Sequence, residues 1–262
     1  MKIGIALSGG AVRGLAHIGV LKALEELGIK PDIVSGVSAG SIIGSFYCAG
    51  YSPKEMEEIA LKTNLNSFIL PSISKKALFS LDKLESFLEK YIGKINIEDL
   101  KIPLIIAATN LNKASVEYFQ NGSLIKTVKA SCSIPVMFKP VKIDKYLYVD
   151  GGVMNNLPVE SLREKVDFAI GVEVNPFLEE EKDFNNIISI GIRSFYLAIR
   201  SNTETSKKLC DLVIQPTELV NIPLFATWKA KEAIEIGYTF TKELIKEQIK
   251  NDKHQRRDNL LG

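Results

Sequence analysis

The first forty residues place a helix between two apolar strands, and this arrangement limits the fold more than any other part of the chain. An apolar run at 3–7 is followed by a glycine-rich turn, and then by leucine and isoleucine at helical spacing over 12–27. Gly28 stands where a helix C-terminal cap belongs, and a second apolar run begins at Ile33. A connection of this length that contains a helix predicts two parallel strands joined by a right-handed crossover.

The remainder of the chain continues the alternation of strands and helices. Further strands are predicted at 103–111, 116–119, 146–149, 168–174 and 211–216, and the strand at 116–119 is expected to form a hairpin with that at 103–111. Further helices are predicted at 123–132, 187–205 and 227–250. The stretch from about 52 to 100 has two amphipathic helix patterns with no strand pattern between them, which predicts a helical insertion. The expected fold is therefore α/β, with three layers and a mostly parallel central sheet flanked by helices. We expect one domain over 1–250 and a charged C-terminal tail over 251–262.

Composition and charge argue against several classes of protein. The 262 residues are 46% hydrophobic and 24% charged, and a net charge of +2 gives no reason to expect nucleic acid as a partner. The three cysteines are far apart, form no CxxC pair and have no nearby histidine, so we predict neither a metal site nor a cofactor. No run approaches the length of a membrane span, and the apolar run at 3–7 is too short for a signal peptide. We expect a cytoplasmic protein that is able to contact a membrane surface transiently. The sequence does not indicate an oligomeric state.

Ser38 lies between two glycines in the segment GVSAG, directly after the second strand. A G-x-S-x-G pattern between a strand and a helix is typical of a nucleophile elbow, in which Gly36 and Gly40 allow a sharp turn with the serine at its apex. The N-terminus of the following helix favours negative charge nearby. The alternative interpretation is a serine that caps the helix beginning after it.

A serine nucleophile needs a base, and the chain has only two histidines. His17 falls on the first helix next to an apolar residue, which favours a packed or capping role, and His254 lies in the charged tail. A Ser-His-Asp triad is therefore not expected. Asp150 is the candidate base, because it follows an apolar strand and precedes Gly151 and Gly152, which turn the chain away. Its alternative role is that of an ordinary Asp-Gly turn.

The glycine-rich turn after the first strand, SGGAVRG, places several backbone N–H groups at the head of a helix. Such an array binds anions, either a phosphate or the oxyanion of a tetrahedral intermediate. The candidate donors are Gly9, Gly10 and Ala11, with Arg13 as a fixed positive charge beside them. Because position 11 is alanine, the G-x-G-x-x-G spacing of a nucleotide-binding loop is absent, and no G-K-[ST] follows it.

These three pieces occur in the same order in one protein family, and the sequence resembles the patatin-like phospholipases. SGGAVRGLAHIGVL, which contains Gly14, is similar to their glycine-rich oxyanion segment, GVSAG to their serine elbow, and DGGVMNNLPV to their Asp-Gly-Gly motif. ASCSIPVMFKPV, at 130–141, is similar to a further segment of the family. The resemblance extends from about residue 3 to residue 175 and implies a catalytic dyad of Ser38 and Asp150 without histidine.

The sequence departs from the family pattern at one position. Ala11 replaces the third glycine of the usual run, so a Cβ atom borders the expected oxyanion site. A conformation with positive φ is expected to be disfavoured there, because only glycine adopts it without steric cost.

The resemblance implies a lipid acyl hydrolase, which is a phospholipase, a lysophospholipase or a related carboxylic ester hydrolase that forms an acyl-enzyme. Its substrate would be a lipid or another acyl ester. A thioesterase or short-chain carboxylesterase could use the same dyad, and a catalytically silent lipid- or anion-binding module could share the fold. The segment FILPSISKKALFSL, at 68–81 inside the helical insertion, is the candidate for an apolar lid that admits acyl chains, with plain core packing as the alternative.

Overall fold

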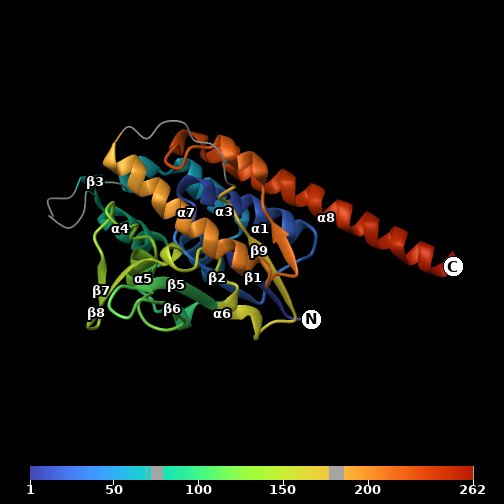
Figure 1. The fold of residues 1–262 in the computed structure, drawn as a ribbon, viewed down its shortest axis with the longest axis horizontal. Helices are drawn as coiled ribbons and strands as arrows, with labels where there is room; N and C mark the ends of the chain where they lie inside the picture. Colours follow the sequence, from blue (N-terminus) through green and yellow to red (C-terminus); the bar gives the residue numbers. More distant parts are fainter. Residues whose placement is uncertain (69, 72–78, 177–185, 262) are drawn as a thin grey trace.

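A computed structural model describes residues 1–68, 70–71, 79–176 and 186–261. Its centre is a sheet with helices on both faces (Figure 1), which confirms the three-layer α/β arrangement expected from the sequence. The helices are α1 (Ala16–Glu26), α2 (Ala39–Ala49), α3 (Pro53–Lys62), α4 (Asp82–Tyr91), α5 (Leu124–Ser131), α6 (Glu160–Arg163), α7 (Ile187–Lys207) and α8 (Ala230–Leu261).

Parallel strands form the middle of the sheet, in the order β10, β9, β1, β2 and β5. Their bounds are Leu212–Ile214 for β10, Phe168–Val172 for β9, Ile3–Leu7 for β1, Ile33–Gly36 for β2 and Leu104–Asn110 for β5. Leu7 at the end of β1 pairs with Val172 on one side and with Gly36 on the other. The carboxyl ends of these strands therefore lie level, at the edge of the sheet where α/β proteins place their ligands.

Antiparallel strands extend the sheet beyond β5. β6 (Ser115–Phe119) pairs with β5 as the hairpin partner that the sequence predicts. β8 (Tyr146–Asp150) is also antiparallel to β5, and β7 (Val141–Ile143) is antiparallel to β8. The sequence predicts neither of these last two pairings, because a short apolar run gives no strand direction and a strand as short as β7 shows no alternation.

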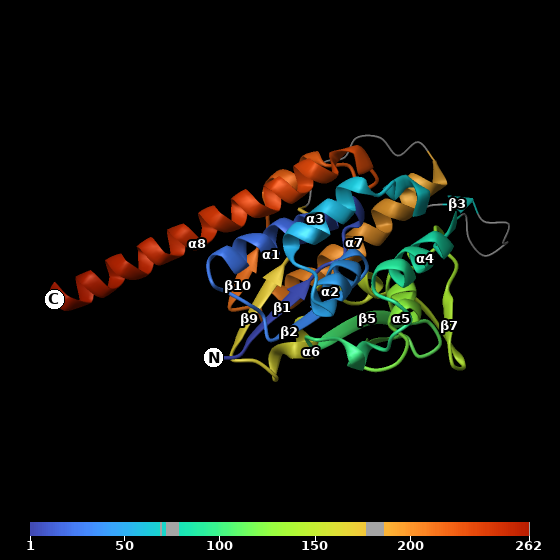
Figure 2. The same ribbon diagram turned by 180° about the vertical axis from the view of Figure 1, so that it is seen from behind.

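The alternating side chains of β1 separate two hydrophobic layers. Ile5 and Leu7 face the larger cluster, which includes residues of α1, α2 and α8, whereas Ala6 faces a smaller cluster that includes α6. Figure 2 shows α1, α2 and α3 in front of the sheet, and Figure 1 shows α7 crossing its other face. The carboxyl edge of the parallel strands is thus enclosed by helices from both layers.

The predicted insertion begins with α3, whose start follows its sequence. The Ser52 side chain accepts a hydrogen bond from the Glu55 N–H, and the Glu55 carboxylate accepts one from the Ser52 N–H, as expected for a capping box.

Between α3 and α4 the structure contains a short strand pair that the sequence does not predict. β3 (Leu70–Pro71) pairs with β4 (Phe79–Ser80). Strands this short show no alternation, so the apolar pattern alone could not reveal them. The middle of the predicted lid segment, 72–78, and residue 69 lie outside the described residues.

The C-terminal helix is longer than predicted. The sequence predicts a helix that ends at about 250 and a charged tail after it, but α8 continues to Leu261 and projects past the body of the molecule (Figure 1). The segment 251–261 contains neither glycine nor proline, and six of its residues are lysine, glutamine, arginine or leucine, which favour helix. Charge alone therefore did not end the helix.

Among the described helices, none is both long and apolar enough to cross a bilayer. The single domain over 1–250, the cytoplasmic location and the membrane-surface contact stay predictions.

Candidate active site

Ser38 lies at the turn between β2 and α2, at the carboxyl edge of the parallel strands. Its backbone has φ 51° and ψ −125°, a combination that residues other than glycine rarely adopt. The next residue, Ala39, begins α2, so the free N–H groups of the helix N-terminus follow the serine directly. Its side chain makes no capping hydrogen bond to the described residues of α2, so the structure favours the elbow over the helix cap.

Gly36 and Gly40 are required because two backbone segments approach closely. A Cβ atom on Gly36 would lie 2.6 Å from the Gly40 carbonyl oxygen, and one on Gly40 would lie 2.2 Å from the Leu7 carbonyl oxygen. A side-chain movement could relieve neither contact, since both are with backbone atoms. The turn that presents Ser38 therefore needs glycine on both sides of it.

Asp150 reaches Ser38 because β2 and β8 meet end to end. On β5, Ile106 pairs with Gly36 of β2 and Ala108 pairs with Asp150 of β8. At both of these positions β6 pairs with the opposite edge of β5. β2 and β8 therefore share one edge of β5. They point toward each other, since β2 is parallel to β5 and β8 is antiparallel. Their carboxyl ends meet there, and Asp150 is the last residue of β8.

Gly151 and Gly152 fix the position of the Asp150 carboxyl group. A Cβ atom on Gly151 would lie 2.5 Å from the Ala107 carbonyl oxygen, so only glycine fits where β8 ends against β5. The Gly152 N–H donates a 2.8 Å hydrogen bond to Asp150 Oδ1. The Asp-Gly turn of the alternative interpretation is thus present, and it orients the carboxyl group beside Ser38.

The Asp150 carboxyl group is buried next to the Ser38 hydroxyl. Asp150 is 2% exposed and Ser38 is 8% exposed. Burial raises the pKa of Asp150 to about 7, and the neighbouring Ser38 hydroxyl and the hydrogen bond from the Gly152 N–H offset part of that rise. A carboxylate of this basicity is a better proton acceptor near neutral pH than an ordinary aspartate.

Two serines at the end of α5 hold both groups in place. Ser131 Oγ accepts a 2.8 Å hydrogen bond from the Ser38 N–H and donates one of 2.7 Å to the Ala107 carbonyl. The Asp150 N–H donates a 2.9 Å hydrogen bond to the Ser133 carbonyl. Neither serine could be assigned a role from the sequence, because an isolated serine carries no pattern that reveals its partner.

The glycine-rich segment runs beside the serine. A Cβ atom on Gly9 would lie 3.0 Å from Ser38 Cβ, so the chain passes directly next to the nucleophile. The Gly9 N–H donates a 3.3 Å hydrogen bond to the carbonyl of Asn156, a residue that the sequence analysis does not single out. The N–H groups of Gly10 and Ala11 have no acceptor among the described residues. These two are therefore better placed than Gly9 to donate to an oxyanion.

Ala11 adopts the positive φ that its side chain disfavours. Its φ is 48°, and it begins a 3₁₀ helix, η1 (Ala11–Leu15), so that α1 starts later than predicted, at Ala16. The left-handed conformation costs an alanine roughly 1–2 kcal/mol. Neighbouring contacts hold it, among them a 3.0 Å hydrogen bond from the Val12 N–H to the Leu224 carbonyl.

Arg13 and Gly14 position the same segment. Arg13 donates hydrogen bonds from Nε to the Ile222 carbonyl, at 2.7 Å, and from Nη2 to the Val220 carbonyl, at 3.4 Å. These bonds tie η1 to the segment after β10. A Cβ atom on Gly14 would lie 2.4 Å from Ala39 Cβ, so η1 packs against the start of α2 only with glycine at that position.

His17 has the packed role that the sequence favours. His17 is fully buried on α1, donates from Nε2 to the Ser8 carbonyl at 2.8 Å, and has its pKa lowered to about 4 by burial. His254 lies in the part of α8 whose side chains are not described. In the described part of the chain, no group of three His, Cys, Asp or Glu side chains is arranged to hold a metal ion.

An apolar cavity of about 190 Å³ adjoins Ser38. Residues of η1, α2 and the insertion helices α3 and α4 line it. Its lining includes Ala11, Leu15, Ile42, Phe46, Met56, Ile59, Leu84, Phe87 and Phe138. A cavity with this lining is suited to a hydrocarbon chain. Residues of the insertion therefore line the cavity beside Ser38.

The family model described as "Patatin-like phospholipase" matches residues 5–163, a span that contains both Ser38 and Asp150. The site residues lie in the segments on which the resemblance of the sequence was based.

Curated proteins similar to the chain are mostly much longer. Lysophospholipase NTE1 of Meyerozyma guilliermondii is 27% identical over 275 residues, which cover 93% of this chain and 19% of that protein. An NTE family protein of Mycobacterium tuberculosis is 33% identical over 181 residues, or 66% of this chain and 49% of that protein. Neuropathy target esterase sws of Drosophila melanogaster is 32% identical over 166 residues, which cover 60% of this chain and 12% of that protein. The chain spans less than half the length of each of these relatives.

Among solved structures, VipD from Legionella pneumophila has a similar fold, with a TM-score of 0.55. The sequences are 17% identical, and the match covers 94% of this chain and 67% of that chain. At this level of identity the similarity extends to the fold alone.

Proposed function

The chain belongs to the patatin-like phospholipase family, and from this premise we propose that it is a lipid acyl hydrolase with Ser38 as the nucleophile and Asp150 as the base. The observation that carries the proposal is the contact between a strained serine and a buried carboxyl group whose pKa lies near neutral. The apolar cavity beside Ser38 supports a substrate with a hydrocarbon chain. The names of two relatives, a lysophospholipase and an esterase, support the same class of reaction.

In the first half-reaction, Asp150 accepts the Ser38 proton as Oγ bonds to the ester carbonyl carbon. The carbonyl oxygen becomes negatively charged and accepts hydrogen bonds from the N–H groups of Gly10 and Ala11. When the tetrahedral intermediate collapses, the bond to the alcohol oxygen breaks and the alcohol leaves with the proton from Asp150. The acyl group is then esterified to Ser38.

In the second half-reaction, water takes the place of the alcohol. It gives a proton to Asp150 as its oxygen bonds to the acyl carbon, and the same N–H groups hold the oxyanion. Ser38 then leaves as the hydroxyl, with the proton from Asp150, and a free carboxylic acid is released. Asp150 therefore acts as base and acid in turn, which suits a pKa near neutral.

The apolar cavity favours a long acyl chain over the short-chain alternative. Each methylene group that moves from water into the cavity contributes about 0.8 kcal/mol. The value of kcat/KM is therefore expected to rise with acyl chain length until the cavity is filled. A series of p-nitrophenyl esters of increasing chain length measures this, and a short-chain carboxylesterase would show its highest kcat/KM at the shortest chains.

Ester turnover by three variants tests the dyad. We expect Ser38→Ala and Asp150→Asn each to lose at least about a thousandfold in kcat, as removal of a nucleophile or its base does in related chemistry. Asp144→Asn is the matched control, since Asp144 lies exposed in the turn between β7 and β8. Near-full activity of Asp150→Asn would show that another group is the base, and activity of Ser38→Ala would show that another group is the nucleophile.

A further inference from the structure

The carbonyl group of Gly9 accepts a hydrogen bond from a side chain that the ester chemistry above does not use. The donor is Asn175 Nδ2. A carbonyl oxygen can only accept, so the Asn175 amide presents its nitrogen, and not its oxygen, to Gly9. Asn175 lies three residues after Val172, the last residue of β9, at the carboxyl edge of the parallel strands. It therefore reaches the glycine-rich segment from the strand that pairs with β1.

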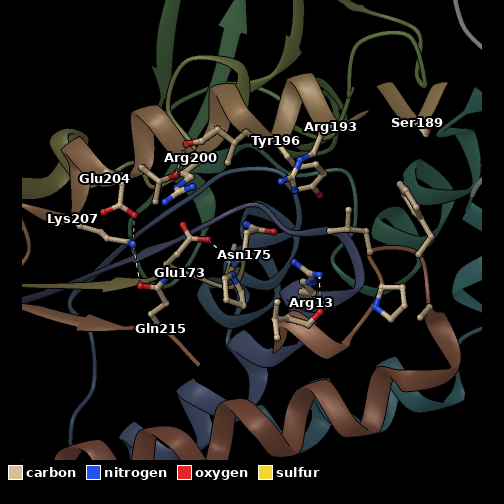
Figure 3. Close-up of a pocket in the computed structure, with 18 of the residues that line it drawn as sticks. Arg13, Glu173, Asn175, Ser189, Arg193, Tyr196, Arg200, Glu204, Lys207 and Gln215 are labelled. Carbon is tan, nitrogen blue, oxygen red and sulfur yellow. Dashed lines mark hydrogen bonds and ion pairs between the residues drawn. The ribbon is translucent and has the colours of Figure 1, made fainter. Parts of the chain in front are cut away.

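Asn175 lines a second cavity, of about 420 Å³, whereas Ser38 lines the apolar cavity. Three arginines contribute to the wall of the second cavity, which we call the arginine-lined cavity; they are Arg13, Arg193 and Arg200. Figure 3 shows Asn175 next to Glu173 in the same wall. The Gly9 carbonyl is thus bonded to a residue of the arginine-lined cavity.

Hydrogen bonds on both sides fix Asn175 in this position. The Asn175 N–H donates a 2.6 Å hydrogen bond to Oε1 of Glu173, which is 1% exposed. The Glu173 N–H donates one of 2.9 Å to the Ile214 carbonyl of β10. The Val174 N–H donates one of 3.0 Å to Ser8 Oγ, directly after β1. The segment that follows β9 is therefore anchored to both neighbouring strands.

The hydrogen bond from Asn175 fixes the orientation of a whole peptide group. The Gly9 carbonyl and the Gly10 N–H belong to one peptide group, which is planar and trans, so they point in opposite directions. The Gly9 carbonyl points to Asn175 Nδ2, and the Gly10 N–H therefore points away from it. The Gly10 N–H is one of the two candidate oxyanion donors.

This peptide group needs a contact from outside the segment because glycine flanks it on both sides. Without Cβ atoms, Gly9 and Gly10 have a wide range of φ and ψ, so the segment itself does little to oppose rotation of the peptide plane. A half-turn would exchange the directions of the carbonyl and the N–H. An oxygen with a partial negative charge would then replace a donor beside the oxyanion and would repel it.

We propose that Asn175 is a positioning residue, which holds the Gly9 carbonyl and thereby directs the Gly10 N–H toward the oxyanion that forms at Ser38. The proposal rests on the proposed ester chemistry and adds to it a residue that does not touch the substrate. Asn175 acts through the peptide group between Gly9 and Gly10. Its effect therefore falls on the transition state, in which the oxyanion develops, more than on substrate binding.

Ester turnover by Asn175→Leu tests this role, because leucine has nearly the shape of asparagine but no N–H donor. Loss of an oxyanion donor lowers kcat about a hundredfold or more, so loss of its positioning should lower kcat at least about tenfold, with little change in KM. Asn175→Asp keeps the size of the side chain and also lacks the donor, so its kcat should fall as well.

Gln215→Leu is the matched control. Gln215 lines the same cavity, and its Oε1 accepts a 2.9 Å hydrogen bond from Lys207 Nζ. The variant replaces an amide with leucine away from the glycine-rich segment, so kcat should stay at the wild-type value. Thermal unfolding of each variant shows that it is folded at the assay temperature. The pH profile of kcat/KM for Asn175→Leu should keep its midpoint, which a general disturbance of the site would shift.

The orientation of the peptide group can be measured by NMR without turnover. The chain has two Gly-Gly pairs, Gly9-Gly10 and Gly151-Gly152. In protein made by cell-free synthesis with isotope-labelled glycine alone, a spectrum that correlates each amide N–H with the preceding carbonyl carbon has one peak for each pair. In Asn175→Leu the Gly9-Gly10 carbonyl should move upfield, because it loses its hydrogen bond, and the Gly151-Gly152 peak should stay in place.

The two measurements give distinct outcomes. An unmoved Gly9-Gly10 peak in Asn175→Leu would overturn the proposal, because Asn175 would not hold that carbonyl. A moved peak together with wild-type kcat, or a loss confined to KM, would overturn the positioning role and leave the proposed ester chemistry intact. A wild-type protein without ester turnover would instead contradict the proposed function itself, and the role of Asn175 would fall with it.

Discussion

The backbone N–H of Ser38 donates a 2.8 Å hydrogen bond to the side chain of Ser131, which in turn donates to the Ala107 carbonyl. One hydroxyl of α5 thus connects the strained nucleophile to the central strand β5. The serine keeps its rare backbone conformation because its surroundings fix it from both sides.

Replacement of Ser131 with alanine should lower both stability and kcat. The Ser38 N–H would be left buried without an acceptor, which costs about 1–3 kcal/mol. The apolar cavity would be unchanged, so KM should change little while kcat falls. Ser133→Ala is the control, because the Ser133 hydroxyl donates to the Lys129 carbonyl within its own helical turn and the Ser133 carbonyl that holds Asp150 remains. Equal kcat values for the two variants would contradict a positioning role for Ser131.

The rate of ester hydrolysis should rise with pH through the pKa of Asp150. Burial raises that pKa to about 7, and only the ionised carboxylate accepts the Ser38 proton. For a neutral soluble ester, kcat/KM should therefore be low at pH 5 and reach a plateau above about pH 8. Glu173 also has a pKa of about 7, so the profile is measured again with Glu173→Gln, which should keep its midpoint. A flat profile across this range would argue against Asp150 as the base.

Asp150→Asn should be more stable than the wild-type protein at pH 8, and its advantage should be much smaller at pH 5. The folded-state pKa of about 7 lies above the ordinary value of 3.8, so the folded protein binds more protons between these values and loses stability as pH rises. Asparagine resembles the protonated carboxyl group and avoids this loss, which amounts to about 4 kcal/mol at most. Thermal unfolding at both pH values measures the difference. If Asp150→Asn were less stable than the wild-type protein at pH 8, this result would contradict the burial of a charged Asp150.

Ala11→Gly should not destabilise the fold, unlike most replacements of alanine by glycine. Glycine removes the strain of a φ of 48°, which offsets its greater loss of backbone entropy on folding. Ala198→Gly, at an exposed position within α7, should cost about 1 kcal/mol, as glycine does in a helix interior. Chemical denaturation of both variants tests the comparison. Equal destabilisation would mean that Ala11 is not held at positive φ.

The elbow could be predicted from the sequence because its requirements are local. Gly36 and Gly40 must be glycine because a side chain at either position would clash with backbone atoms within a few positions of Ser38 or on the neighbouring strand β1. The pattern G-x-S-x-G contains both glycines, so it indicates the turn directly. Asp150 could be picked out as a candidate for a similar reason, since it follows an apolar run and precedes two glycines.

The meeting of Ser38 with Asp150 could not be derived from local patterns. It depends on β8 running antiparallel along the same edge of β5 that β2 occupies, and nothing in the run at 146–149 indicates that direction. The family resemblance implied the pair instead. Asn156, which engages the Gly9 N–H, and the arginine-lined cavity were also missed, because their partners are brought together only by the folded chain.

Labelling with a fluorophosphonate probe, followed by mapping of the adduct, tests the pairing of Ser38 with Asp150 most directly. We predict an adduct on Ser38 in the wild-type protein and in Asp144→Asn, with labelling of Asp150→Asn slowed at least about a hundredfold because the nucleophile has lost its base. Labelling of Asp150→Asn at the wild-type rate, or an adduct on a serine other than Ser38, would contradict the account.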